Sequence, residues 1–92
     1  MTFDPSATIV RTSEAIATEI DGEIVLIHIE DGKYFGLDPV GSEIWRRLET
    51  PKRVDALCDE LKAHFEGDPN MIEREALAFL DQLSESRLLL AA

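Results

Sequence analysis

Two Asp-Gly pairs constrain the fold of this chain more than any other feature of its sequence. They are Asp21-Gly22 and Asp31-Gly32, and both residue types tolerate the positive φ angles of tight hairpin turns. The segments around them are rich in β-branched residues, which favour strands. The pattern therefore predicts a three-stranded antiparallel meander over residues 15–20, 23–30 and 33–37, with a further short strand at 8–11.

The middle predicted strand is apolar on both of its alternating faces. Residues 24–27 and Ile29 are all aliphatic, whereas a strand with one wet face alternates apolar and polar side chains. We therefore expect both faces of the sheet to be covered at least in part. A chain of 92 residues has difficulty covering both, and a partner could supply part of the cover.

Helical spacing replaces the strand pattern after Asp38-Pro39. Apolar residues recur at helical intervals over 39–49, and Thr50-Pro51 supplies an N-cap and a first-turn proline for a second helix. Gly67 ends that helix, and Asp68-Pro69 begins a third. The order predicts an α+β domain of winged helix-turn-helix type, with a three-stranded antiparallel sheet followed by three helices. We expect one domain over 1–92, with 1–7 as a loose arm and 87–90 extended and packed.

The charge of the chain limits its partners and its location. The formal net charge is −10, and residues 1–37 and 38–92 each carry −5. Such a field repels nucleic acid and anionic membranes and favours partners with some positive charge. The start of the chain lacks the pattern of a signal peptide, and no apolar stretch is long enough to span a bilayer. A single cysteine, Cys58, fits a reducing compartment, so we expect a cytoplasmic protein.

Candidate catalytic residues are few, and none forms a convincing set. Cys58 lies within the apolar stripe of its predicted helix, so we expect a core residue rather than a nucleophile. His64 lies on a different side of that helix, and His28 is expected to be a partly buried strand residue. Metal-ligand spacing and a phosphate-binding glycine loop are both missing from the sequence. We therefore predict no enzymatic activity, no metal and no cofactor.

Binding to DNA is disfavoured although the predicted architecture invites it. The third predicted helix carries four acids between positions 73 and 85 against Arg74 alone, and a recognition helix must meet a polyphosphate. The one basic cluster consists of Arg46, Arg47, Lys52 and Arg53. It fits either a solvated surface balanced by nearby acids, which we favour, or a docking patch for a partner protein.

The last predicted strand, residues 33–37, forms an edge of the sheet with little protection. Only Lys33 provides a charge, and Gly36 allows another backbone to approach. An open edge beside a helix can accept a peptide as an added strand. The alternative is that Tyr34, Phe35 and Leu37 pack the core while the terminus of the chain covers the edge. The pattern alone supports both interpretations equally.

The run from Gly32 to Leu48 resembles the PqqD-like family. That family shows the pattern Gly-x-Tyr/Phe-x-x-Leu-Asn/Asp-x-x-Gly-x-x-Ile-Trp-x-x-Leu where the strand meets the first helix. The segment 51–61 and the segment 79–83, followed by Leu88-Leu89, match further parts of the family pattern. The resemblance covers about residues 10–90, and it lies in the order and spacing of the motifs.

The resemblance implies a RiPP recognition element that binds the leader of a ribosomally synthesised precursor peptide by strand addition. It places the leader contacts on the edge strand and the third helix, at Lys33, Tyr34, Phe35, Gly36, Leu37, Glu73, Ala76, Leu77 and Leu80. The preferred role is presentation of the leader to a leader peptidase or macrocyclase in lasso-peptide biosynthesis. The alternatives are a peptide chaperone in pyrroloquinoline quinone synthesis, a winged-helix transcription regulator, and a structural subunit whose open edge pairs with its own copy in a stable dimer. For the leader-binding protein itself, the partner considered besides the leader and the enzymes is a second copy in a weak homodimer.

Overall fold

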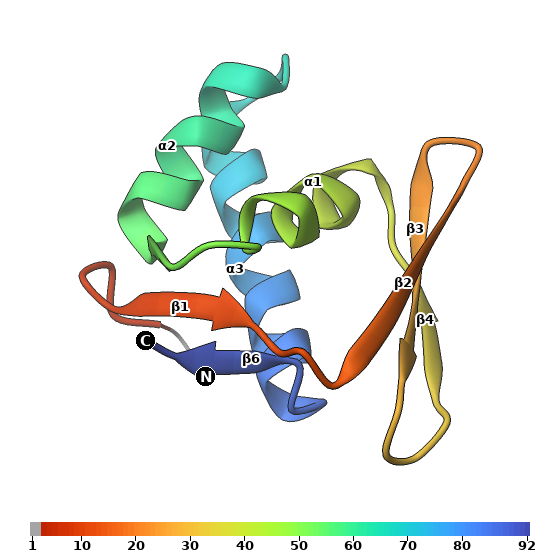
Figure 1. Cartoon of the computed structure of the whole chain (residues 1–92). Helices are drawn as coiled ribbons and strands as arrows, with labels where there is room; N and C mark the ends of the chain where they lie inside the picture. The colour runs from red at the N-terminus through yellow and green to blue at the C-terminus, as the bar shows by residue number, and fades with distance from the viewer. Residues whose placement is uncertain (1–2) are drawn as a thin grey trace.

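The computed structural model describes residues 3–92 and has an α+β architecture, which confirms the predicted class (Figure 1). The elements, in chain order, are β1 (Thr8–Arg11), β2 (Ala15–Ile20), β3 (Glu23–His28), β4 (Tyr34–Gly36), α1 (Pro39–Arg47), β5 (Lys52–Arg53), α2 (Val54–His64), α3 (Pro69–Glu85) and β6 (Leu89–Ala91). The more specific winged helix-turn-helix description stays a prediction.

The predicted meander is present as the antiparallel sheet β2-β3-β4. Its first turn is the expected tight one, with Asp21 at φ 52° and Gly22 at φ 84°. The second connection differs from the prediction because β3 ends at His28 and β4 begins at Tyr34. Within this longer loop only Gly32 has a positive φ, of 72°, and the Asp31 side chain accepts a hydrogen bond from the N–H of Lys33.

A second three-stranded sheet, in the order β5-β1-β6, corrects the prediction of a single sheet. The predicted strand at 8–11 is its centre, and the chain's C-terminal segment pairs with it antiparallel, Val10 opposite Leu90. Its other neighbour is the two-residue strand β5, with Thr8 opposite Arg53. These pairings join segments that lie far apart in sequence, so no local turn signal marked them.

The start of α2 also differs from the prediction. Thr50-Pro51 does not cap this helix, because residues 52–53 form β5 and the helix begins at Val54 with Arg53 as an N-cap that makes no side-chain bond. The N–H groups of Val54 and Asp55 donate instead to the carbonyls of Ala7 and Pro5, each at 2.9 Å. The N-terminal segment therefore satisfies donors that a capping side chain would otherwise take.

Those same bonds tie residues 3–7 to the body of the molecule. Phe3 and Ala7 are partly buried and pack against the core. Residues 3–7 of the predicted arm therefore bond and pack against the body of the molecule, and residues 1–2 lie outside the described residues.

The hydrophobic core lies where the three helices meet the inner faces of the two sheets. Figure 1 shows α1 between the β2-β3-β4 sheet and the pair α2 and α3. On β3 the alternate residues Ile24, Leu26 and His28 are buried, so this face of the sheet is turned toward the core. In residues 3–92, no helix is long and apolar enough to cross a membrane.

Candidate functional site

The free edge of β4 offers unpaired backbone groups to an incoming strand. β4 pairs with β3 alone, with Phe35 opposite Leu26. The bonds from Leu37 N–H to the Ile24 carbonyl and from His28 N–H to the Lys33 carbonyl, both 2.8 Å, fix which residues face β3. Since bonding direction alternates along an antiparallel strand, the N–H and C=O of Tyr34 and Gly36 point toward the open edge.

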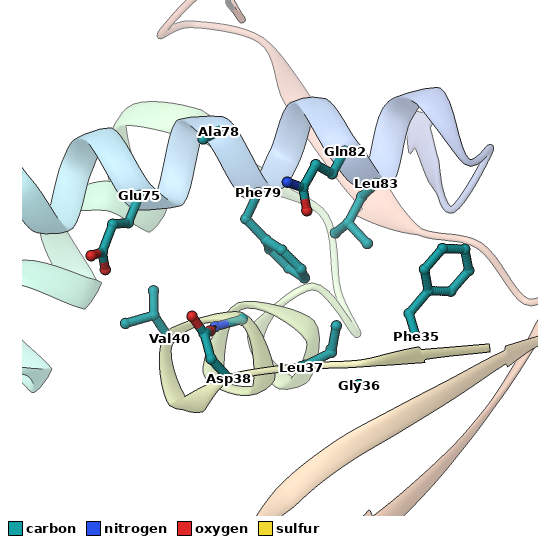
Figure 2. A pocket seen from close by; sticks show the side chains of 11 residues that line it. Phe35, Gly36, Leu37, Asp38, Val40, Glu75, Ala78, Phe79, Gln82 and Leu83 are labelled. Carbon is teal, nitrogen blue, oxygen red and sulfur yellow. The ribbon is translucent and has the colours of Figure 1, made fainter.

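A groove separates this edge from α3 (Figure 2). It encloses about 370 Å³. One wall is the chain from Phe35 to Gly41, and the other is the face of α3 that carries Glu75, Ala78, Phe79, Gln82 and Leu83. We refer to this cavity as the β4–α3 groove. Figure 2 shows Phe35 and Leu37 projecting from the strand toward the helix, so apolar side chains line a space beside free backbone donors and acceptors.

Three of the five predicted strand residues line the β4–α3 groove: Phe35, Gly36 and Leu37. The other two lie elsewhere. Tyr34 is exposed on the opposite face of the sheet, across from Ile27. Lys33 lines a neighbouring polar cavity of about 400 Å³ near the end of α3, which Phe35 also borders.

The four residues predicted on the third helix do not line the β4–α3 groove, and their contact with a leader stays a prediction. Ala76 and Leu80 are fully buried in the core. Glu73 and Leu77 border a separate cavity of about 220 Å³ on the side of α2. There Glu73 accepts a 2.8 Å hydrogen bond from Lys62, which raises the pKa of the Lys62 ammonium.

The four residues lie away from the groove because of the positions of their side chains around the axis of α3. A helix turns about 100° per residue, so a core stripe is flanked by one apolar margin on each side. The buried positions Ile72, Ala76, Leu80 and Leu83 are flanked by Leu77 toward α2 and by Phe79 toward β4. The sequence alone shows that an apolar margin flanks each side of the buried stripe, but it does not show which margin faces β4.

Sequence reasoning also missed the contact that brings α1 and α3 together at the groove. A Cβ on Gly41 would lie 3.2 Å from the ring of Phe79 and 3.1 Å from the Asp38 carboxylate. Asp38 is the N-cap of α1 and accepts a 2.7 Å bond from the Gly41 N–H. Glycine at this position therefore lets the ring of Phe79, which lies in the middle of the groove lining (Figure 2), approach α1 closely.

Ser42 was missed as well, and it fixes the sheet against α1. It is fully buried. Its hydroxyl accepts a 2.9 Å bond from the Ile24 N–H and donates to the Leu37 carbonyl at 3.3 Å. A polar residue inside an apolar helix face is the only signal that could have found it. Through these two bonds Ser42 sets where β4 lies relative to the helices.

The charge along the β4–α3 groove is negative. Its lining includes the carboxylates of Asp38 and Glu75 and no lysine or arginine. The basic cluster predicted around the first helix junction is elsewhere, and ion pairs neutralise it. Arg46 pairs with Glu19, Arg47 and Lys52 both pair with Glu60, and Arg53 pairs with Asp55. The structure thus favours the interpretation of this cluster as a balanced surface.

The three residues weighed for catalysis do not form a site together. Cys58 is buried, and burial raises the pKa of its thiol, which disfavours the reactive thiolate. His28 is also buried, whereas His64 is exposed and packs edge-on against Phe65. Across residues 3–92, no group of three or more His, Cys, Asp or Glu side chains is placed to hold a metal ion.

Comparisons with known proteins agree with this architecture. The family model described as Coenzyme PQQ synthesis protein D (PqqD) matches residues 23–89, while a search of curated proteins gave no match. TbiB1, solved in complex with the TbiA(beta) leader peptide, is 39% identical, with coverage of 87% of this chain and 93% of the TbiB1 chain and a TM-score of 0.75.

Two further solved structures are more distant and share the fold. Lasso peptide synthetase B1, complexed with the leader peptide, is 22% identical over 89% of this chain and 96% of that chain, with a TM-score of 0.73. The PqqD truncation of Methylobacterium extorquens PqqCD, described as a RiPP recognition element, is 20% identical over 96% and 94%, with a TM-score of 0.74. Because the family model matches well over half of the sequence, this chain belongs to the PqqD family.

Proposed function

We propose that this chain is a single recognition domain that binds the leader of a precursor peptide and presents it to a leader peptidase. The observation that carries the proposal is the open edge of β4 beside the apolar β4–α3 groove. The most similar chain reported above, TbiB1, was solved with a leader peptide bound. This supports peptide capture as the role of the edge.

In the proposed complex the leader adds as a strand to β4. Its backbone bonds with Tyr34 and Gly36, whose N–H and C=O groups face the open edge. Those bonds depend little on sequence, so specificity comes from the groove. An aliphatic or aromatic leader side chain would fill the space bounded by Phe35, Leu37 and Phe79, where burial of apolar area supplies the gain in free energy.

The acidic lining adds a second source of selectivity. Asp38 and Glu75 border the groove, and the chain carries a net charge of −10. Leaders with lysine or arginine beside their apolar anchor would therefore associate faster, and the effect would weaken in salt. The bound leader holds the rest of the precursor close to the processing enzyme, which raises its effective concentration there.

A role in a lasso-peptide pathway is the form of the proposal that we favour. The resemblance to the leader-bound B1 proteins supports it, whereas the link to pyrroloquinoline quinone synthesis rests on the description of the family and on a structure only 20% identical. A transcription regulator fits less well, because α3 exposes acidic side chains and the molecule repels phosphate. No step in the proposed function needs a cofactor.

The test is a fluorescence-polarisation titration with the labelled leader of the precursor encoded beside this chain. The diagnostic variant is Ala78→Lys, which puts a bulky positive charge on the exposed wall of the acidic groove. The matched control, Ala56→Lys, makes the same change at an exposed position of α2 that borders no cavity described above.

We expect saturable binding by the wild-type chain, binding weakened at least about tenfold by Ala78→Lys, and no effect of Ala56→Lys. A scrambled leader should not bind. Equal affinities of all three proteins for the leader would exclude the groove as the site, and failure of the wild-type chain to bind the cognate leader would exclude the function.

A further inference from the structure

A polar cavity continues the β4–α3 groove beyond Phe35. It encloses about 400 Å³ and is lined by the end of β3, the connection between β3 and β4, and the C-terminal end of α3. Phe35 borders both spaces, and Figure 2 shows it at the Leu83 end of the groove. We call this space the polar cavity. A peptide strand that follows β4 past Phe35 therefore reaches it.

The polar cavity is lined by a buried histidine that lacks a hydrogen-bond partner. His28 is only 4% exposed, and its Nδ1 atom makes no hydrogen bond within residues 3–92. Oδ1 of Asp31 lies 3.7 Å from this nitrogen, which is too far for a hydrogen bond. A buried polar atom that is left unpaired costs free energy in the folded protein. A ligand that supplies the missing partner recovers part of this cost on binding.

Nδ1 can be reached from the polar cavity because the group beside it is half exposed. The side chain of Asp31 is 50% exposed, and its Oδ1 accepts a bond from the exposed N–H of Lys33. Water can replace that bond when the carboxylate turns outward. An incoming polar group can then take the place of the carboxylate beside Nδ1.

The lining of the polar cavity favours an uncharged polar side chain. Its less exposed part consists of the imidazole of His28, Ser86 and Phe35. Exposed charges of both signs form the rim, at Glu30, Asp31, Lys33, Glu85 and Arg87. The three carboxylates disfavour an anion and the two cations disfavour a lysine or arginine, while an unmatched charge buried against the imidazole is costly. A hydroxyl or carboxamide both donates and accepts, so it can pair with the imidazole and the serine hydroxyl.

The period of a β-strand determines which leader side chain enters the polar cavity. Side chains on one face of a strand lie two residues apart, roughly 6.6 Å along the chain. β4 shows the same spacing, because Phe35 borders both spaces whereas Lys33, two residues earlier, borders the polar cavity alone. A leader strand paired with β4 therefore places one inward side chain in the apolar groove. Its next inward side chain, two residues away in the direction of Lys33, lies at the polar cavity.

From this arrangement we propose that the polar cavity is a second leader subsite, which takes a hydroxyl or carboxamide side chain two residues from the apolar anchor. His28 and Ser86 are its specificity-determining residues. The inference rests on the proposed leader-binding function and deepens it. The groove supplies affinity through apolar burial, whereas the polar cavity discriminates among leaders that share the same anchor. Such a site discriminates well because a leader without the polar group leaves the buried nitrogen unpaired.

The experiment combines variants of the full-length chain with an alanine scan of the labelled leader of the precursor encoded beside it, read by fluorescence polarisation. His28→Phe removes both ring nitrogens and keeps a planar ring, and His28→Asn restores a polar atom close to the position of Nδ1. Ser86→Ala removes only a hydroxyl and gives an independent test. The matched control is His64→Phe, at an exposed histidine of α2 that borders neither space. Circular dichroism confirms that each protein folds.

The apolar anchor is identified as the leader residue whose replacement by alanine weakens binding most. We expect alanine at a hydroxyl or carboxamide residue two positions from it to weaken wild-type binding about fivefold or more. His28→Phe should bind the unaltered leader about fivefold more weakly and show no further loss with that alanine leader, because both changes remove the same hydrogen bond. His28→Asn should recover part of the affinity, and His64→Phe should match the wild type.

Independent, additive losses from His28→Phe and the leader replacement would overturn the inference. So would wild-type binding in which no polar leader residue two positions from the anchor contributes. If His28→Phe does not fold, the same comparison with Ser86→Ala decides. In each of these outcomes the wild-type chain still binds leader, so the proposed function stands. A wild-type chain that does not bind the cognate leader would instead refute the proposed function, and this inference with it.

Discussion

Replacement of Gly36 by proline tests strand addition at one backbone donor. The N–H of Gly36 points away from β3, so proline removes no bond of the sheet itself. Proline is tolerated on edge strands, and the residue before it stays extended. Its ring would occupy the place that an incoming carbonyl oxygen must reach. The variant should therefore fold normally while losing its ability to pair with a peptide strand.

The expected loss follows from the bonds at stake. One hydrogen bond contributes about 0.5–1.5 kcal/mol net. A strand displaced by the ring loses the bond to the Gly36 N–H and the neighbouring bond to its C=O. The sum, about 1–3 kcal/mol, corresponds to leader binding weakened about 5- to 150-fold, which fluorescence polarisation resolves readily.

Gly36→Ala is the matched control for this position. A Cβ on Gly36 meets no atom within 4 Å, and the N–H remains. We expect leader affinity within about twofold of wild type, with equal or slightly higher stability because alanine restricts the unfolded chain. Wild-type affinity in a folded Gly36→Pro protein would refute the reasoning, because a strand that pairs with this edge must lose the hydrogen bond from the Gly36 N–H.

Three further outcomes follow, two from contacts at the groove and one from the ion pairs of the basic cluster. Ser42→Ala leaves the buried N–H of Ile24 without its acceptor, so thermal denaturation should show a loss of about 1–3 kcal/mol, and an unchanged melting temperature would contradict the role of the hydroxyl. Gly41→Ala should alter stability little, because a gain in helix propensity of about 1 kcal/mol offsets the close contact. The new Cβ should nevertheless push the Phe79 ring into the groove and weaken leader binding in the titration. Hydrogen bonds from Lys52 and Arg47 lower the pKa of the Glu60 carboxyl group in the folded protein. Its ion pairs therefore stabilise the protein above the pKa of glutamate in the unfolded chain, about 4.3. This stability is lost as the pH falls through the folded pKa. The denaturation midpoint of Glu60→Gln should therefore change less than that of the wild type between about pH 6 and pH 3. Parallel profiles of the midpoint against pH for the two proteins would exclude this contribution.

The elements that the sequence predicted well are those with local signals. Asp21-Gly22 marked a true tight turn, and Pro39 and Pro69 marked the first residues of α1 and α3. The apolar stripe of α2 placed Cys58 in the core, as expected. In each case the signal and the structure it specifies lie within a few residues of one another, so one sequence suffices.

The elements that escaped prediction depend on contacts between distant segments. The β5-β1-β6 sheet forms because Thr8 meets Arg53 and Val10 meets Leu90, and nothing local requires either pairing. The groove face of α3 depends on how closely Phe79 approaches Gly41, which is a matter of how two helices pack. The strand side of the site was more predictable because its open edge follows from the order of the meander.

The apolar middle strand gave a prediction that was correct on one face of the sheet. The side with Leu26 is covered by the chain's own helices, whereas Ile27 on the other side is exposed. A chain of this length has too little apolar mass to cover both faces. The exposed side carries the row of Ile16, Ile27 and Tyr34.

Amide hydrogen exchange of Tyr34 and Gly36, measured by NMR with and without saturating leader, tests the central claim most directly. In the free chain these two N–H groups face an open edge and should exchange quickly. If the leader adds as a strand to β4, both should become strongly protected, while the N–H of Leu37, already bonded to Ile24, should change much less. Saturable leader binding that leaves the exchange of Tyr34 and Gly36 unchanged would contradict strand addition at this edge.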